Sequence, residues 1–320
     1  MDKQEFTHVS VLLHESIEAL AIRPDGVYVD GTLGRAGHSL EIARRLKTGR
    51  LICIDRDEAA IEAAEERLAP YLDKVTLVHG NFSAVDEILK HLDLSGADGM
   101  LFDLGVSSPQ LDDAARGFSY MHDAPLDMRM DRQAALTAHT VVNTWPAEEL
   151  RRILFEYGEE RYAGAIAKAI VRARESGPID TTLQLVEIIR AALPAAARRE
   201  KQHPAKRSFQ AIRIAVNDEL GALLPMLRGA VRCLNPGGRL CVITFHSLED
   251  RIVKKTMQEL AKGCTCPPDF PVCVCGNKPK LRLVTRKPVT PGAAELQDNP
   301  RARSAKLRVA ERTEFEWKED

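Results

Sequence analysis

The sequence lacks the features that mark membrane proteins, secreted proteins and strongly charged nucleic-acid binders. Its 45 lysines and arginines stand against 46 aspartates and glutamates, so the formal net charge is −1 and no strong overall field attracts a polyanion. It has no apolar run long enough to cross a bilayer, and no N-terminal segment in which basic residues precede an apolar stretch. We therefore expect a cytoplasmic protein without a membrane partner. Internal repeats and low-complexity tracts are also missing, and 320 residues suffice for one large domain or two smaller ones.

The cysteines fall into two groups. Cys53, Cys233 and Cys241 stand singly in apolar surroundings, which is typical of small core side chains. The other four form a Cys-x-Cys…Cys-x-Cys pattern and are Cys264, Cys266, Cys273 and Cys275. Four thiolates suit tetrahedral zinc, but the usual pair has about two to four residues between its cysteines. Two alternatives therefore stay open, structural zinc or reduced thiols in a surface loop.

A glycine-rich turn at residues 27–38 is the strongest local feature, reading Val-Tyr-Val-Asp-Gly-Thr-Leu-Gly-Arg-Ala-Gly-His. A short strand pattern ends on Asp30, and a helical pattern begins after the turn. Backbone N–H groups and the positive end of the helix dipole gather at such a place. The Gly-x-x-Gly-x-x-Gly spacing is neither the dinucleotide fingerprint nor a P-loop. The turn indicates either a nucleotide-like ligand or a purely structural need for glycine.

Strands alternate with helices before and after a long helical stretch. We expect strands at 27–30, 50–55, 75–80, 97–103, 239–245, 281–285 and 305–310. Near-continuous apolar strands separated by helices predict a mostly parallel α/β sheet covered on both faces. Between them we expect helices at 146–157, 162–174 and 183–192. A further helix at 211–234, followed by a turn at Asn-Pro-Gly-Gly (235–238), should lead back to the sheet. We therefore predict core segments at 1–109 and 207–320 and an inserted helical subdomain at 110–206.

Several residues that could bind a nucleotide-like ligand follow directly after strands. Ligands of open parallel sheets bind beyond the carboxyl ends of the strands. Asp55 follows the glycine turn at about the 20-residue interval of an acid that binds ribose hydroxyls. Phe82 offers an adenine ring an apolar face, and Asp103 can accept hydrogen bonds from a cationic amine. The alternatives are that Asp55 caps a helix, Phe82 belongs to the core and Asp103 is a turn residue.

This arrangement resembles the class I S-adenosylmethionine-dependent methyltransferases, which have a Rossmann-like fold, although Thr32 stands where their loop usually has a second glycine. Longer motifs resemble the MraW/RsmH family of bacterial 16S ribosomal RNA cytosine-N4 methyltransferases. They are Asp-Gly-Thr-Leu-Gly-Arg-Ala-Gly-His (30–38), Asp-Leu-Gly-Val-Ser-Ser-Pro-Gln-Leu-Asp (103–112), Gly-Phe-Ser-Tyr (117–120), Leu-Asp-Met-Arg-Met-Asp (126–131), Phe-His-Ser-Leu-Glu-Asp-Arg (245–251) and Asn-Pro-Arg-Ala-Arg-Ser (299–304).

The resemblance implies methyl transfer from S-adenosylmethionine to N4 of a cytidine in the decoding region of 16S ribosomal RNA, within the small subunit. It implies that the donor is bound by Gly34, Ala36, Gly37, His38, Asp55, Phe82, Asp103 and Gln110. Catalysis would fall to Asp103 and to the segment Ser107-Ser108-Pro109, a variant of the turn that orients an exocyclic amine in amino-methyltransferases. The alternative for that segment is a simple Ser-Pro turn. No catalytic metal is expected.

Two basic segments are candidates for RNA contact. Residues 198–213 carry several arginines and lysines together with Phe209, and a second group lies at 301–308. Cations neutralise phosphates and an aromatic ring can stack on an extruded base, but a solvated helix face is the ordinary alternative. With the resemblance, we expect Arg207 and Arg213 to contact RNA and the target base to leave its stack.

Two rival functions and one question of assembly remain. A nucleotide-dependent oxidoreductase is disfavoured by the glycine spacing. A ribosome assembly factor that binds RNA, with a non-catalytic cofactor site, is the rival outside enzymes. The sequence also leaves open whether the chain is a monomer or a homodimer.

Overall fold

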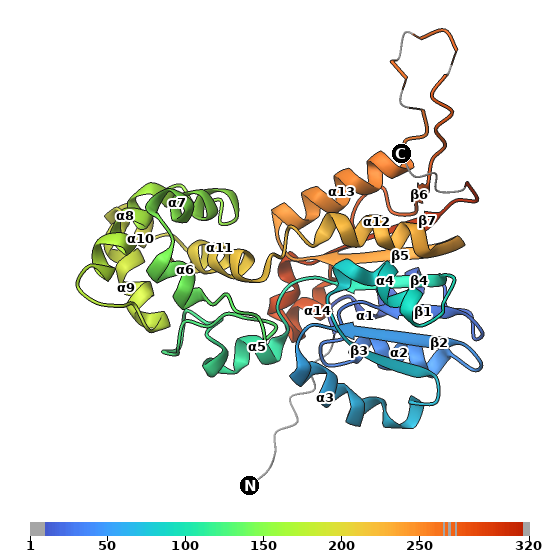
Figure 1. Ribbon diagram of the computed structural model, residues 1–320, viewed down its shortest axis with the longest axis horizontal. Helices are drawn as coiled ribbons and strands as arrows, with labels where there is room; N and C mark the ends of the chain where they lie inside the picture. Colours follow the sequence, from blue (N-terminus) through green and yellow to red (C-terminus); the bar gives the residue numbers. More distant parts are fainter. Residues whose placement is uncertain (1–9, 265, 268–269, 273, 316–320) are drawn as a thin grey trace. The chain divides into compact units, whose positions relative to one another are not determined.

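The computed structural model describes residues 10–264, 266–267, 270–272 and 274–315. The chain forms two compact units (Figure 1). Unit 1 comprises residues 1–105 and 221–320, and unit 2 comprises residues 106–220. In the described part of the chain, no helix is both long and apolar enough to span a membrane.

Unit 1 is built on a seven-stranded sheet in the order β3-β2-β1-β4-β5-β7-β6. The strands are β1 Val27–Asp30, β2 Arg50–Asp55, β3 Val75–His79, β4 Ala97–Asp103, β5 Leu234–Thr244, β6 Leu281–Leu283 and β7 Lys306–Arg312. Strands β1 to β5 are parallel to one another, and β7 runs antiparallel between β5 and β6. The predicted α/β fold with a mostly parallel sheet is therefore confirmed.

Helices cover both faces of this sheet, with α1, α2 and α3 on one face and α4, α12 and α13 on the other (Figure 1). Their bounds are α1 Leu13–Ala19, α2 Gly37–Arg45, α3 Glu58–Leu68, α4 Val85–His91, α12 Leu223–Cys233, α13 Ser247–Ala261 and the short α14 Ala293–Asp298. Because both faces are covered, consecutive residues are buried along a strand, as at Leu51–Ile54 and Met100–Phe102. That double burial explains the uninterrupted apolar runs of the sequence.

The approach to β5 differs from the expectation of one helix and a turn. A single helix at 211–234 is wrong, because α11 (Lys206–Asn217) ends where Asp218 takes a left-handed φ of 48°. A second helix, α12, then leads to the sheet. The predicted turn at 235–238 lies within β5, where the pairing with β4 shifts register at a bulge that Gly237 accommodates with a φ of 81°.

Unit 2 is helical and has a core of its own. Its helices are α5 Ser108–Asp112, α6 Ala138–Thr144, α7 Ala147–Glu156, α8 Ala163–Arg174, α9 Thr182–Ala192, α10 Ala195–Arg198 and α11. Helices α7, α8, α9 and α11 meet around a fully buried centre formed by Leu150, Ile153, Ile166, Ile170, Leu185, Ile189 and Ile212. The three helices expected within the insertion are confirmed, and the side chain of Thr181 caps α9.

Candidate functional site

The glycine turn after β1 passes close to β4 and then reaches the end of β2. A Cβ atom on Gly31 would lie 2.3–2.4 Å from the ring of Phe102, so only glycine fits there. Gly34 has a φ of 49°, and its backbone N–H donates to Oδ2 of Asp55 at 2.8 Å. The turn is therefore fixed to the carboxyl ends of β4 and β2, the two strands that flank β1.

Asp30 holds the turn against α2 from inside the protein. Its carboxylate is fully buried and accepts hydrogen bonds from the backbone N–H of Thr32 at 3.2 Å and the hydroxyl of Ser39 at 2.6 Å. Burial raises the pKa of Asp30, although these hydrogen bonds oppose the shift. Asp30 is therefore a positioning residue of the turn.

Asp55 does not cap the following helix. Asp57 does so, because its side chain accepts from the backbone N–H of Ala59. The two oxygens of Asp55 accept from the N–H groups of Asp57 at 2.9 Å and Gly34 at 2.8 Å. Burial raises the pKa of Asp55. Since each carboxylate oxygen has two lone pairs, Asp55 can hold the turn and still accept from a ligand hydroxyl.

Phe82 lies just beyond β3, in a half-buried position. Its ring meets the ring of Phe102 edge to face, with centroids 6.1 Å apart, and the guanidinium of Arg56 lies 5.4 Å from its centroid. One neighbour is thus a core residue and the other is charged. The ring of Phe82 therefore lies at the edge of the core, where one of its faces can pack against a ligand.

Asp103 ends β4 and has a carboxyl oxygen that the fold leaves without a hydrogen bond. Its Oδ1 atom is buried and has no hydrogen-bond partner among the described residues. Burial and the negative charges of Asp30, Glu249 and Glu295 raise the pKa of Asp103 well above its usual value. A turn residue would satisfy its carboxylate locally, whereas Oδ1 of Asp103 still has the capacity to accept a hydrogen bond.

His38, at the start of α2, faces Asp103 with its Nδ1 atom 3.9 Å from Oδ2. Its Nε2 atom lies 3.1 Å from the carbonyl oxygen of Val11, which can only accept, so Nε2 carries the proton. Burial lowers the pKa of His38 to about 4, which keeps the ring neutral. Two acceptors, Nδ1 and Oδ2, therefore face each other, and a ligand with N–H groups would satisfy both.

Thr32 is a functional detail that sequence reasoning missed. It appeared only as a departure from the usual glycine, yet its hydroxyl oxygen accepts from the backbone N–H of Asp103 at 2.6 Å. Glu249 is a second such residue, since its Oε2 accepts from the N–H of Phe245 at 2.8 Å, just beyond β5. The only signal for Glu249 was its place in the 245–251 motif. Both residues fix backbone at the carboxyl end of the sheet.

In unit 2, the segment Ser107-Ser108-Pro109 forms the start of α5. Ser107 is the N-cap, and Gln110 completes a capping box by accepting from the N–H of Ser107 at 3.0 Å. The carbonyl of Ser107 accepts from Leu111. Gln110 is 5% exposed, so its side chain has a structural task within this unit. The simple Ser-Pro turn of the alternative is thus a capped helix start.

The two arginines expected at RNA differ in their surroundings. Arg213 is 16% exposed, and its guanidinium forms a bidentate pair with Glu219 at 2.7–2.8 Å. Arg207 is half-buried and donates to the carbonyl of Glu159 at 3.0 Å. Phe209 is 3% exposed and cannot stack on a base. The same region nevertheless exposes Arg198, Arg199, Lys201 and Lys206.

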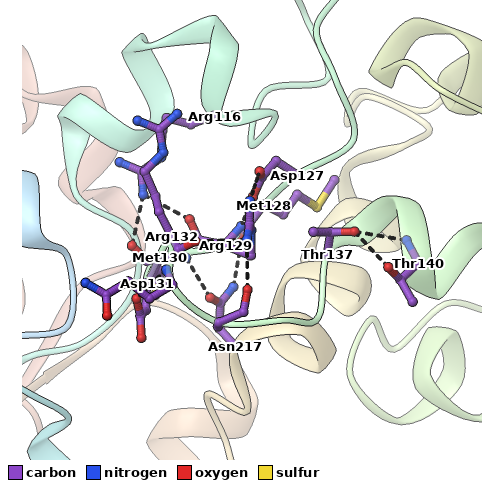
Figure 2. A network of polar contacts seen from close by, with 12 residues as sticks. Arg116, Asp127, Met128, Arg129, Met130, Asp131, Arg132, Thr137, Thr140 and Asn217 are labelled. Carbon is purple, nitrogen blue, oxygen red and sulfur yellow. Dashed lines mark hydrogen bonds and ion pairs between the residues drawn. The ribbon is translucent and has the colours of Figure 1, made fainter.

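The motif at 126–131 is a loop that side chains hold from several directions (Figure 2). Asn217 donates to the carbonyl of Met128 and accepts from the N–H of Met130, both at 2.8 Å. Arg116 donates to the carbonyls of Arg129 and Met130 at 2.9 and 3.0 Å. The conformation of this loop, including the φ of 59° at Met128, is therefore imposed by unit 2 itself.

The second basic group, at the C-terminal end of unit 1, is partly neutralised. Asp250 accepts from Arg308 at 2.7 Å and lies 3.2 Å from the ammonium of Lys306. Although burial opposes the shift, these cations lower the pKa of Asp250. Arg301 and Arg303 are exposed. Only part of this group therefore presents its charge outward.

Comparison with known proteins places this site in a family. The family model described as the MraW methylase family matches residues 5–313. A protein of Symbiobacterium thermophilum is 62% identical over 305 residues, which cover 95% of this chain and 96% of that one. A protein of Paenibacillus sp. is 59% identical over 314 residues, covering 96% of this chain and 99% of that one. Both are named ribosomal RNA small subunit methyltransferase H. With the sheet order and the glycine turn already described, the conclusion is that the chain belongs to the MraW methylase family.

Proposed function

We propose that this chain transfers a methyl group from S-adenosylmethionine to N4 of a cytidine in the decoding region of 16S ribosomal RNA. Membership in a methylase family and the names of its relatives support a methyltransferase acting on small-subunit RNA, and they exclude the oxidoreductase alternative. The base and the atom rest on the motif resemblance. The structural observation that carries the proposal is the buried, unpartnered Oδ1 of Asp103 at the end of β4.

The residues at the sheet edge fit the methyl donor. S-adenosylmethionine supplies an electrophilic methyl group on a sulfonium, together with an ammonium, a ribose diol and an adenine ring. Asp103 and Nδ1 of His38 offer acceptors to the cationic end, where an N–H group would relieve their opposition. Asp55 has lone pairs left for ribose hydroxyls, and half-buried Phe82 can pack on the adenine. At the start of α2, the donor would lie against the backbone of Gly34, Ala36 and Gly37, and Gly34 has no side chain to obstruct it.

The same proposal gives the chain a way to orient the amine. The N4 lone pair of cytosine is shared with the ring, so acceptors that turn the N–H groups help to direct it at the methyl. Asp103 is one acceptor, and the segment Ser107-Ser108-Pro109 is the second candidate. Three residues lie between Asp103 and Ser107, so four Cα-to-Cα steps limit their Cα distance to about 14 Å. The methylated ammonium is far more acidic than the amine, so its proton can leave after transfer.

On the RNA side, unit 2 supplies cations and an aromatic pair. Exposed Lys201 and Lys206 are free of any role in the core and suit phosphates. Tyr120 and His203 stack with centroids 4.5 Å apart, in half-buried positions, and burial lowers the pKa of His203. We assign direct contact to Arg207 and the exposed cations, and to Arg213 the positioning of α11 through Glu219. Action on small-subunit RNA supports a reaction in the cytoplasm, where ribosomes assemble.

Radiolabelled methyl transfer tests the proposal. Purified enzyme and labelled S-adenosylmethionine are incubated with small subunits that lack the modification and, separately, with naked 16S RNA. Digestion to nucleosides should then yield labelled N4-methylcytidine, and the preferred substrate shows whether assembled RNA is read. Measured donor binding without transfer to either substrate would instead favour the RNA-binding assembly factor.

A further inference from the structure

The segment between α13 and β6 belongs to unit 1 but projects from its sheet and returns close to where it began (Figure 1). At its base, the backbone N–H of Lys280 donates to the carbonyl of Leu260 at 2.7 Å, and the N–H of Thr313 donates to the carbonyl of Lys280 at 3.1 Å. The described residues of this segment form neither a helix nor a strand. These two hydrogen bonds fix the base of the segment. They do not fix the conformation of its outer part.

Burial of apolar side chains does not order that part. Phe270, Val272 and Val274 are exposed by 51%, 69% and 72%. An apolar core therefore contributes little to the conformation of this segment. Small elements without a core are commonly held by a disulfide or a metal ion.

The thiols of the segment converge in a way that fits a metal ion. The Sγ atoms of Cys264, Cys266 and Cys275 all lie within 4.8 Å of one another. Those of Cys264 and Cys275 are 3.8 Å apart, far beyond the roughly 2.05 Å of a disulfide bond. With Zn–S bonds of about 2.3 Å, tetrahedral geometry places two sulfurs about 3.8 Å apart. The observed separation therefore matches the one that two thiolates have on a shared zinc ion.

The short Cys-x-Cys spacing is compatible with this arrangement. The backbone N–H of Cys266 points at Sγ of Cys264 at 3.4 Å, so the chain between them turns tightly. Hydrogen bonds to ligand atoms orient metal ligands and stabilise the thiolate form. In the sequence, the short Cys-x-Cys spacing argued against zinc. The N–H contact shows that this spacing is compatible with two cysteines that bind the same ion.

We propose that Cys264, Cys266 and Cys275 bind a structural Zn²⁺ ion that fixes the segment between α13 and β6. Each thiol loses its proton to solvent on binding, and the metal gains no electron. Structural zinc sites have four ligands, and the fourth position is taken by a further group. Cys273, the remaining cysteine of the segment, lies outside the described residues. The site belongs to the loop alone and is independent of the methyl-transfer chemistry.

Metal analysis of the full chain tests the proposal. The protein purified without chelator should hold close to one zinc ion per chain, and the double variant Cys264→Ser/Cys275→Ser should hold almost none. Cys233→Ser is the matched control, because this half-buried cysteine of α12 lies outside the cluster and its loss should leave the zinc content unchanged. Equal zinc in the double variant and the wild type would overturn the assignment.

Two further measurements distinguish zinc binding from an iron–sulfur cluster and from oxidised thiol pairs. Replacement of zinc by Co²⁺ should give the visible absorption of tetrahedral thiolate coordination in the wild type and in Cys233→Ser, but not in the double variant. Limited proteolysis should cut the segment faster after chelation. Iron with acid-labile sulfide in the purified protein, or titration that finds oxidised thiol pairs and no tight zinc binding after reduction, would refute the proposal.

Discussion

The acids at the sheet edge of unit 1 and the arginines of unit 2 are both buried charges, but they are satisfied differently. Arg213 has a carboxylate partner, Glu219, at 2.7 Å. Arg116 is 7% exposed and donates to two backbone carbonyls of its own unit. Asp103 keeps a buried oxygen without any partner among the described residues. A buried charge costs free energy unless it is paired. The fold itself pairs the two arginines, whereas in the proposed function a ligand would pair Asp103.

This difference separates structural from functional residues better than residue type does. Arg213 looked like an RNA ligand because it stands in a basic segment, yet its charge is used inside unit 2. Asp103 looked like an ordinary strand-end acid, yet nearby carboxylates make its charge costly in the absence of a cation.

The largest effect is expected at Asp103. Asp103→Ala and Asp103→Asn should lower the rate of methyl transfer by about 10³-fold, because each removes a charge from the site of donor and amine. The measurement is single-turnover transfer, with RNA binding followed separately and expected to stay within about twofold.

Asp98→Asn is the matched control. Asp98 lies on the same strand at the opposite end of the sheet, where it is bonded to Asn235 and to the N–H of Val27. Its substitution should leave the transfer rate within about threefold of the wild type. A rate for Asp103→Asn equal to that of Asp98→Asn would remove Asp103 from the reaction.

The next effect contrasts paired and exposed cations in unit 2. Arg213→Ala should lower the free energy of unfolding by about 2–3 kcal/mol, because Glu219 is then left buried without its main partner. Exposed Lys206 on the same helix is the matched control, and Lys206→Ala should change stability by less than about 0.5 kcal/mol. Lys206→Ala should instead reduce the salt dependence of RNA binding by about one unit of slope. Equal stability of the two variants, measured by urea unfolding, would contradict the structural role of Arg213.

Much of the fold can be predicted from local sequence patterns. Most of the contacts that distinguish satisfied from unsatisfied charges cannot be predicted in this way. Buried parallel strands have continuous apolar runs, and parallel topology then brings the ends of β2 and β4 to one edge, which places Asp55 and Asp103 together. Contacts across long stretches of chain leave no such pattern. The bond from Asp103 to the hydroxyl of Thr32 spans 71 residues, and that from Met130 to Asn217 spans 87.

The break between α11 and α12 shows the same limit at the level of a helix. Apolar residues recur on both sides of Asp218, so the periodicity predicts one continuous helix. The chain nevertheless turns there, because α11 packs on α7 within unit 2 while α12 packs on α13 within unit 1. Tertiary packing overrides the local pattern, and the sequence alone does not reveal which neighbours a helix will find.

A smaller effect is expected in the glycine turn. Gly31→Ala should destabilise the protein by about 1–3 kcal/mol, because the new Cβ atom would lie 2.3–2.4 Å from the buried ring of Phe102. Gly34→Ala should cost only about 1 kcal/mol, since its left-handed φ is strained but no side chain lies near. Thermal unfolding without ligand compares the two. A larger loss at Gly34 would mean that the turn is set by backbone conformation and not by its contact with β4.

The smallest effect concerns pH and isolates the charge of Asp103. Burial and the charges of Asp30, Glu249 and Glu295 raise its pKa in the folded protein, so the folded state keeps a proton that the unfolded state has lost. Stability contributed by this group therefore falls as pH rises from the ordinary carboxyl value to the raised one. Asp103→Asn has no such proton, so its free energy of unfolding relative to the wild type should increase across that window and then level off. His38, whose pKa is lowered to about 4, is present in both proteins and largely cancels in the difference. Urea unfolding of both proteins, without donor and with saturating donor, measures this difference in the free energy of unfolding. Bound donor should reduce its dependence on pH, because the cation of the donor then compensates the carboxylate. A difference that is constant with pH, or that grows when donor binds, would show that Asp103 is satisfied by the fold, as Arg213 is.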